Sequence, residues 1–576
     1  MTSFLMSRGS VMDSVSMDKQ LRWLSIGLFV LIAMLSLLPS LRLLLEAFSH
    51  TTLSTYSPLS EVLRSERTWT ALRNSFYTSG LGTLIAVVLG CGFAFVVTLT
   101  NIRGRAIWVF CFMLPMMIPP QVTALSWLQL FGPASPILNT LGIAPALGSS
   151  QPMYSAEGIA LLLGIQSAPL VFLSLRTQLI SLPQDLLEAA QLSRATQFQV
   201  WVDIILPLCR GAIIAGAALA FVSSLGNFGI PAMLGIPAGY IVLPTLIYQK
   251  MAGFGNDMLS QVAGLSMIIA LLVLAGMLCQ QWLQQRSRYA LLGHTAQSLS
   301  FCLKQWRLPI ELLLGLVLCF ILIAPLFALI VSSLVPALGM PLTADTITFS
   351  AFYEMIGRQG VTARAFENSA LLATLSALLL MAVCLPLGYL LMRLPMRTRA
   401  VIASLIEVPY AIPGIVLAIA FILLFAKPLP FIEVSLYGTL GIIFLAYLSC
   451  FLSVCLKPVL SAMSQLDPAL EEAAQLAGAK PLQRLIDIIL PLTAPAFFAG
   501  GLLVFLIAIN ELTVSALLWS AGNETLGVLI FNLDESGDSV LASAIAVLVV
   551  LLVTGVMSLL SLFAPRLPKG VIPWHG

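Results

Sequence analysis

Residues 188–208 read EAAQLSRATQFQVWVDIILPL, and residues 472–492 read EAAQLAGAKPLQRLIDIILPL. At this constant offset of 284, 13 of the 21 positions are identical. Each copy is a polar, helix-prone segment between long apolar runs, which is where a membrane protein presents a surface to a soluble partner. The duplication therefore predicts a membrane protein of two equivalent halves, each with one docking element.

The composition also indicates a membrane protein. The 576 residues are 59% hydrophobic and only 9% charged, with a mean hydropathy of +1.00, far from the values of soluble domains. Apolar runs of 20 or more residues recur, long enough to cross about 30 Å of hydrocarbon as helices. Helices satisfy their own backbone groups, and the alternating pattern of a barrel is missing. We therefore predict an all-α polytopic membrane protein.

Other chemistries find little support in the sequence. The nine cysteines form no CxxC pair, and the three histidines share no spacing that suits a metal site. The net charge of +3 comes without a basic, aromatic-interleaved patch, so no nucleic-acid partner is expected. No lysine follows a glycine, which rules out a Walker A motif. We expect no cofactor, no metal and no ATP site in this chain.

Twelve apolar runs can be counted, and the first is too long for the apolar part of a cleaved signal peptide. The predicted spans are 23–45, 75–99, 106–131, 157–180, 210–235, 259–282, 308–333, 368–392, 401–426, 436–457, 493–519 and 540–563.

The distribution of basic residues orients these spans. If the N-terminus is cytoplasmic, 8 of the 28 Lys and Arg residues fall outside and 20 fall inside. An even number of spans then places both termini in the cytoplasm. The two repeated segments, which begin with Glu-Ala-Ala and are called the EAA segments, also fall there.

The duplication extends beyond the EAA segments, because Asn74-Ser75 and the prolines 115 and 119 recur at an offset of 294 as Asn368-Ser369 and prolines 409 and 413. Six spans separate equivalent points, so the two repeats are parallel. The expected domains are a first repeat (1–290), a cytoplasmic linker (291–307) and a second repeat (308–576). The proline pairs are expected to kink spans three and nine.

The repeated segment resembles the EAA signature of permease subunits of binding-protein-dependent ABC importers. We take residues 183–208 and 467–492 as the two EAA loops. The second matches the signature fully, whereas the first has Arg194 where the family has glycine, which predicts a different turn or weaker docking. The residues that the resemblance assigns to ATPase coupling are Glu188, Ala189, Ala190, Arg194, Asp203 and Pro207, and Glu472, Ala473, Ala474, Gly478, Asp487 and Pro491.

Two EAA loops in one chain resemble the fused permeases, especially the iron(III) group. The resemblance implies two separate ATP-binding subunits, which hold ATP and Mg²⁺, at the cytoplasmic face. It also implies an extracytoplasmic substrate-binding protein and a place in the bacterial inner membrane, in contact with lipid. Iron(III) is the expected substrate, and thiamine, 2-aminoethylphosphonate and polyamines remain alternatives.

Polar residues within the spans are candidates for the substrate pathway. Asn227 interrupts span five, Asn510 and Glu511 interrupt span eleven at matching positions, and Glu407 lies in span nine. The competing interpretation is interhelical contacts that hold the bundle together.

The sequence fits two other functional classes less well. An ion-coupled secondary transporter of twelve spans would need more buried charged residues and gives no reason for two EAA loops. A structural assembly factor explains neither the duplication nor Glu511.

Overall fold

A computed structural model describes most of the chain. The described residues are 19–48, 57–146, 148–182, 190, 192–196, 199–253, 258–286, 301–357, 360–427 and 435–563. Within them ten helices are long and apolar enough to cross a membrane, and two further pairs of shorter helices count as one broken span each. The prediction of about twelve helical spans is confirmed.

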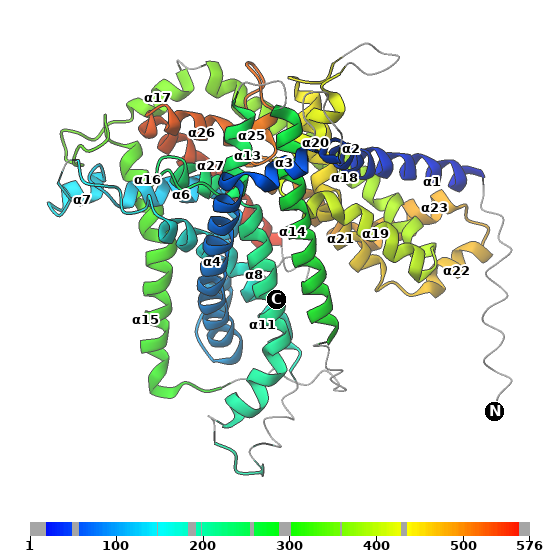
Figure 1. Ribbon diagram of the computed structural model, residues 1–576. Coiled ribbons are helices and arrows are strands. Elements are labelled where there is room, and N and C mark those ends of the chain that lie inside the picture. The colour runs from blue at the N-terminus through cyan, green and yellow to red at the C-terminus, as the bar shows by residue number, and fades with distance from the viewer. Residues whose placement is uncertain are drawn as a thin grey trace.

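The first repeat runs from the N-terminal helix to a long helix that ends at Arg286 (Figure 1). Its elements are α1 (Lys19–Ile32), η1 (Ala33–Leu37), α2 (Leu38–Phe48), α3 (Pro58–Arg64), α4 (Glu66–Leu99), α5 (Arg105–Met117), α6 (Pro120–Leu130), α7 (Pro136–Thr140), α8 (Ala156–Ile180), η2 (Val200–Ile205), α11 (Leu206–Gly226), α12 (Gly229–Gly235), α13 (Leu243–Met251) and α14 (Met258–Arg286).

The second repeat has counterparts of most of these elements in the same order. These are η3 (Lys304–Trp306), α15 (Arg307–Leu318), η4 (Cys319–Ile323), α16 (Ala324–Ser333), α17 (Ser350–Gly357), α18 (Gly360–Arg393), α19 (Met396–Ala411), α20 (Gly414–Phe425), α21 (Leu440–Met463), α22 (Pro468–Leu476), α23 (Pro481–Arg484), η5 (Leu485–Ile489), α24 (Leu490–Ala508), α25 (Ser515–Leu518), α26 (Leu526–Glu535) and α27 (Ser539–Phe563).

Spans three and nine are broken where the proline pairs predicted a kink. Helices α5 and α6 meet at 100°, as do α19 and α20. The break falls at the second proline of each pair, because the residue before a proline is forced into an extended conformation. Ile118 and Ile412 have ψ values of 135° and 136°. The bend is therefore much deeper than a kink, and each pair of helices turns within the bundle.

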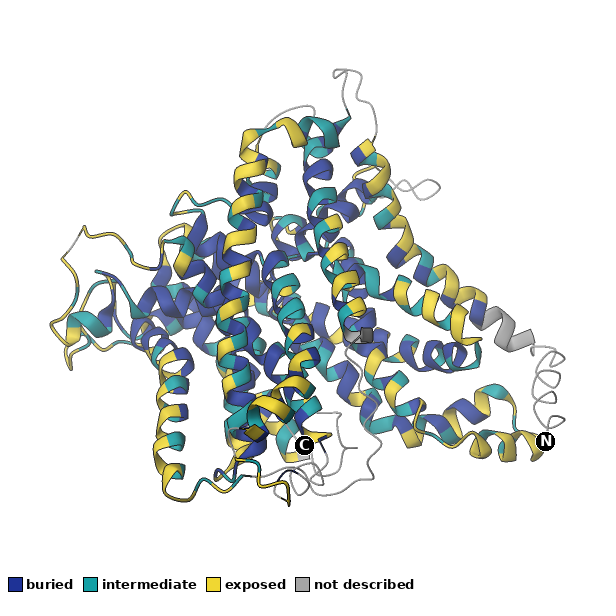
Figure 2. Ribbon diagram, turned by 60° about the horizontal axis from the view of Figure 1, so that its bottom comes forward, coloured by how far each residue is buried: buried dark blue, intermediate teal, exposed yellow. Residues whose placement is uncertain are grey.

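Each repeat has a three-helix core. Helix α4 packs on α8 and α11, and its counterpart α18 packs on α21 and α24. At Gly90 in α4 a side chain is excluded, since a Cβ there would lie 2.6 Å from the carbonyl oxygen of Ala168. Figure 2 shows buried residues toward the centre and exposed residues along the outer faces of the long helices. Exposed apolar faces of this kind suit contact with lipid.

The first span of each repeat packs against the broken span of the other. Helix α2 lies against α20, and α16 lies against α6. Each repeat therefore packs against the broken span of the other, and both broken spans lie between the repeats.

The repeated Asn-Ser pair has the same structural role in both halves. The Ser75 hydroxyl accepts a hydrogen bond from the Leu243 amide at 2.8 Å, and the Ser369 hydroxyl accepts one from the Leu526 amide at 2.8 Å. Helices α13 and α26 are thus tied to α4 and α18 at equivalent points, which shows the duplication in three dimensions.

Candidate functional site

The second EAA loop is a helix, a tight turn and a short second helix. The Asp467 carboxylate caps α22 by accepting a hydrogen bond from the Ala469 amide at 3.0 Å, and Pro468 occupies the first turn. The turn follows at Gly478, whose φ is +83°, and the Ala479 amide donates to the Ala474 carbonyl at 3.0 Å. This is the left-handed helix ending that glycine favours.

The first EAA loop makes the same turn without glycine. Arg194 adopts a φ of +54°, and the Ala195 amide donates to the Ala190 carbonyl at 3.0 Å. After the turn the side-chain oxygen of Gln199 accepts from the Thr196 amide at 2.8 Å, as Gln483 does from Lys480 at 2.9 Å. The two loops therefore turn in the same way although the residue differs, and weaker docking of the first loop stays a prediction. In the first loop this geometry costs about 1–2 kcal/mol, because arginine, unlike glycine, is disfavoured in the left-handed conformation.

Most coupling residues that the sequence singled out are exposed on these loops. Glu188 and Ala189 lie outside the described residues, and Ala190 and Ala474 are at least partly buried. The exposed ones are Arg194, Asp203, Pro207, Glu472, Ala473, Gly478, Asp487 and Pro491.

A matched pair of leucines also stands out from the loops. Leu192 is 86% exposed and Leu476, its counterpart at the offset of 284, is 90% exposed. An apolar side chain in the same exposed place on both loops suits insertion into a pocket of a soluble partner.

The second loop is held to the membrane helices by a charged cluster. Glu471 of α22 accepts hydrogen bonds from Arg393 and, at 2.6 Å, from the Tyr389 hydroxyl, both at the end of α18. Arg484 approaches the same carboxylate at 3.4 Å and is itself only 6% exposed. We call Tyr389, Arg393, Glu471 and Arg484 the loop anchor. It connects α22 directly to the end of α18.

The loop anchor could not be found by comparing the two repeats, because its residues occur only in the second. The first repeat has apolar residues where the second has Tyr389, Arg393 and Arg484, namely Phe95, Leu99 and Val200. There the contact is aromatic instead: the rings of Phe95 and Trp201 lie 5.0 Å apart. A signal was present in the basic residue that ends span eight, opposite an acidic loop.

A cavity of about 250 Å³ lies where four interrupted spans converge. Its wall includes residues 116–121 at the break of span three, Gly229 after the break of span five, Tyr410 beside the break of span nine, and residues 510–513 at the break of span eleven. Both repeats contribute, so we call it the central cavity.

Glu511 serves as a helix cap at the edge of this cavity. Its carboxylate accepts hydrogen bonds from the amides of Val514 at 2.8 Å and Ser515 at 3.1 Å, and from the Thr513 hydroxyl. The residue is 8% exposed. These donors offset the burial of a carboxylate, and they leave one face of Glu511 toward the cavity.

Asn510 and Gln121 carry polar atoms without partners in the described structure. Asn510 is 7% exposed, and neither its side-chain oxygen nor its nitrogen makes a hydrogen bond; the same holds for the side-chain oxygen of Gln121. The Gln121 nitrogen donates to the Asn510 backbone carbonyl at 3.4 Å. Unpaired buried amides at a cavity wall are suited to bind a passing polar solute or water. Gln121 was not among the sequence candidates, although its place beside Pro119 and Pro120 could have indicated it.

The remaining two candidates lie apart from this wall. Asn227 accepts a hydrogen bond from the Ile230 amide at 3.1 Å and so caps α12. Glu407 forms an ion pair with Lys457 at 2.9 Å and lines a different cavity. Within the described residues no group of three or more His, Cys, Asp or Glu side chains is placed to hold a metal ion.

Several known proteins are similar in sequence to this chain. The ferric transport system permease protein FbpB of Actinobacillus pleuropneumoniae is 26% identical over 475 residues, which is 81% of this chain and 67% of that protein. A probable ABC transporter permease protein of Sinorhizobium fredii is 24% identical over 97% of this chain and 99% of its own length. A putative 2-aminoethylphosphonate transport system permease protein of Salmonella typhimurium is 30% identical over 36% of this chain and 79% of that protein.

One similar solved structure is a bacterial ABC transporter involved in the import of the acidic polysaccharide alginate, with 17% identity and a TM-score of 0.38 over 46% of this chain and 98% of the matched chain. The family model named "binding-protein-dependent transport system inner membrane component" matches residues 82–289 and again residues 384–569. Each match contains one EAA loop and one set of interrupted spans. The chain therefore belongs to the family of binding-protein-dependent transport system inner membrane components and carries the family's domain twice.

Proposed function

We propose that this chain is the permease of an iron(III) importer, with both EAA loops and both termini in the cytoplasm. Each loop docks on one separate ATP-binding subunit, and an extracytoplasmic binding protein delivers the substrate to the other side. The observation that carries the proposal is the matched pair of loops, which keep the same turn at Arg194 and Gly478 and the same exposed leucines.

The path from loop to substrate is short in both repeats. Each EAA loop leads through a π-helical turn, η2 or η5, directly into the span whose break lies at the central cavity. Movement of the docked loops therefore reaches the cavity wall through one helix on each side. In this mechanism the chain supplies the passage, and the partner subunits supply ATP hydrolysis.

Iron(III) is favoured as substrate by relatives named as ferric permeases that cover most of this chain. The central cavity offers amide and hydroxyl groups, together with a single capped carboxylate. Such groups give the weak contacts that passage requires, since a tight cage would retain the ion. A 2-aminoethylphosphonate substrate is the second candidate, because that relative is more similar over a shorter segment.

Reconstitution tests the proposal. The permease is placed in liposomes with its ATPase and binding protein, and uptake of radiolabelled iron(III) is measured with and without ATP. We expect uptake that requires ATP and the binding protein. Uptake driven by a proton or sodium gradient alone would contradict the importer class. ATP-dependent uptake of 2-aminoethylphosphonate without iron would overturn only the substrate.

A further inference from the structure

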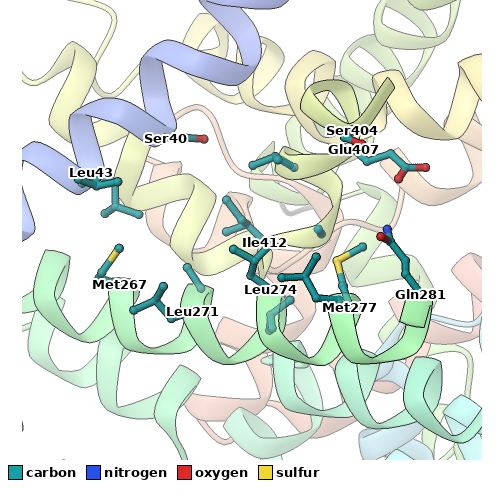
Figure 3. Close-up of a pocket in the computed structure, with 16 residues that line it drawn as sticks. Ser40, Leu43, Met267, Leu271, Leu274, Met277, Gln281, Ser404, Glu407 and Ile412 are labelled. Carbon is teal, nitrogen blue, oxygen red and sulfur yellow. The ribbon is translucent and has the colours of Figure 1, made fainter. Parts of the chain in front are cut away.

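A second cavity, of about 260 Å³, lies between the two repeats (Figure 3). It is bounded by α2 and α14 of the first repeat and by α19 with the break of span nine. One face of α14 forms its floor, with Met267, Leu271, Leu274 and Gln281 in sequence along it (Figure 3). We call this cavity the lateral groove.

The groove is apolar along its length and polar at one end. Figure 3 shows Leu43 and Met267 at one end, and Glu407 and Gln281 at the other. The polar end lies toward the EAA loops: α14 ends soon after Gln281, and α19 starts beside the loop anchor. From Met267 to Gln281 the floor extends about 21 Å, at 1.5 Å per residue.

The groove opens toward the surface that faces the membrane. Leu271, Leu274 and Leu278 lie in a predicted span and are 47–57% exposed. An apolar cavity of this kind excludes water. Its floor is somewhat longer than one leaflet, which is about half of a 30 Å hydrocarbon core. The acyl chain of a lipid from the leaflet on the EAA-loop side fits both the chemistry and the length.

The polar end matches one type of headgroup. The Glu407 carboxylate and the Lys457 ammonium lie 2.9 Å apart, with side chains 33% and 58% exposed. A headgroup with a primary ammonium and a phosphate provides a partner for each of these charges.

The first repeat shows what opens the groove. At the offset of 294, Ser404 and Ala411 replace Phe110 and Met117, and Glu407 replaces Met113. The corresponding face of α5 thus carries bulk where α19 carries small or polar side chains. Met113 is fully buried, whereas Glu407 reaches solvent and Lys457.

We propose that the lateral groove binds phosphatidylethanolamine, with an acyl chain along α14 and the headgroup at Glu407 and Lys457. The chain packs on Ala411 and Ile412, immediately before the break at Pro413. Tyr410 lines the central cavity from the same turn of helix. A lipid in this place therefore supports the bend of span nine from outside. The inference does not depend on which substrate is carried.

Photocrosslinking in nanodiscs tests the site. The permease is reconstituted in phosphatidylcholine, and phosphatidylethanolamine or phosphatidylcholine with a photoreactive acyl chain is added in trace amounts. Labelled peptides are then counted by mass spectrometry. For the wild type we expect labelling of residues 267–281, with phosphatidylethanolamine favoured. Equal labelling by the two headgroups would overturn the headgroup assignment, and no labelling of this segment would overturn the site.

Variants that copy the first repeat sharpen the test. Ser404→Phe with Ala411→Met fills the groove and should reduce labelling of residues 267–281 about tenfold. Leu551→Phe adds bulk on an exposed face of α27 and serves as the matched control, with labelling unchanged. Full labelling in the filled variant would contradict the proposal.

Two milder variants cover the case in which the filled variant does not fold. Leu274→Trp adds bulk at a side chain that is already half exposed, and it should also block labelling. Glu407→Gln should abolish the preference for phosphatidylethanolamine over phosphatidylcholine while acyl-chain labelling persists. A preference that survives this substitution would remove Glu407 from the headgroup site.

Discussion

Asn227 and Glu511 occupy equivalent positions and make the same hydrogen bond in the two repeats. Asn227 accepts from the Ile230 amide at 3.1 Å, and Glu511 accepts from the Val514 amide at 2.8 Å. All four residues follow the offset of 284 that relates the EAA loops. Spans five and eleven are thus interrupted in the same way. After each break, a side-chain oxygen accepts a hydrogen bond from a backbone amide at the start of the next helix.

Glu511 has two features that a substitution can separate: the hydrogen bond that it accepts from Val514 and its charge at the cavity. Glu511→Gln keeps one acceptor oxygen for Val514 but removes the charge and the second acceptor. We expect the permease to assemble with its ATPase and to transport more slowly, because a cationic or hydrated substrate loses a favourable charge at the cavity. Uptake in vesicles, normalised to assembled complex, is the measurement. Wild-type uptake would limit Glu511 to its capping role.

Glu511→Ala gives the matched comparison. It removes every side-chain acceptor from the start of α25, and loss of a helix cap costs about 0.5–2 kcal/mol. We expect less assembled complex and a lower thermal unfolding midpoint than for Glu511→Gln. If the two variants assembled equally, the cap would be energetically unimportant.

The turn of the first loop should improve with glycine. Arg194→Gly removes the cost of about 1–2 kcal/mol that a left-handed conformation imposes on a non-glycine residue. Glycine loses more conformational entropy on folding, which cancels about 0.5–1 kcal/mol of that gain. We expect a slightly higher thermal unfolding midpoint with unchanged loop geometry. Gly478→Ala is the mirror experiment and should lower the midpoint. A gain from alanine at 478 would contradict the turn assignment.

The two loops have the same turn, but the side chains around them differ. We expect replacement of Glu472 to uncouple transport from ATP hydrolysis more than replacement of Glu188. The physical reason is that α22 is fixed by the loop anchor, whereas the corresponding residues around the first loop are apolar. Substrate-stimulated ATPase activity in reconstituted complexes measures the difference, and equal losses would contradict the asymmetry.

Glu471 offers a direct test of the loop anchor. Glu471→Gln weakens the hydrogen bonds from Arg393 and Tyr389 and removes the ion pair with Arg484. Hydrogen bonds to a charged group contribute about 1.5–3 kcal/mol each. We expect the ATPase to remain bound while less substrate moves per ATP hydrolysed. Exchange of the charges, Glu471→Arg with Arg393→Glu, should restore part of the coupling. Failure of the exchange, with normal assembly, would argue against transmission through this pair.

The sequence predicted the elements that follow from hydrophobicity and duplication. The twelve spans, a bend at each proline pair and the two EAA loops all have a local signal in the chain, although the bends are deeper than the predicted kinks. The backbone at Arg194 had no such signal, because its left-handed turn goes with two hydrogen bonds of the surrounding loop: the Ala195 amide donates to Ala190, and the Gln199 side chain accepts from Thr196. Residue type alone favoured a different turn there.

Contacts between distant segments were beyond the sequence. Gln121 and Asn510 lie 389 positions apart and meet because the interruptions of spans three and eleven both lie at the central cavity. Glu407 illustrates the opposite case: its place in an apolar span made it a candidate for the pathway, and in the fold it pairs with Lys457 and lines the lateral groove. Side-chain direction after a 100° bend depends on the packing of the whole bundle.

Asp534 lies at the end of α26, outside the candidate spans. Burial raises the pKa of this carboxyl above its ordinary value, although a hydrogen bond from the Ser539 hydroxyl at 2.6 Å partly opposes the shift. A raised pKa in the folded state means that the fold binds the proton more tightly than the unfolded chain does. Its contribution to stability is then full below the ordinary pKa of about 3.9 and is lost as pH rises through the folded value.

Asp534→Asn removes this dependence while keeping an acceptor for Ser539. We expect the variant to unfold at a higher temperature than the wild type at neutral pH, with the difference closing as the pH falls toward about 4. Thermal unfolding of the purified permease across this pH range is the measurement. Asp538→Asn, an exposed neighbour, is the control and should leave the pH profile unchanged. A variant at Asp534 that is less stable at neutral pH would show that the charged carboxylate, and not its burial, dominates at this site.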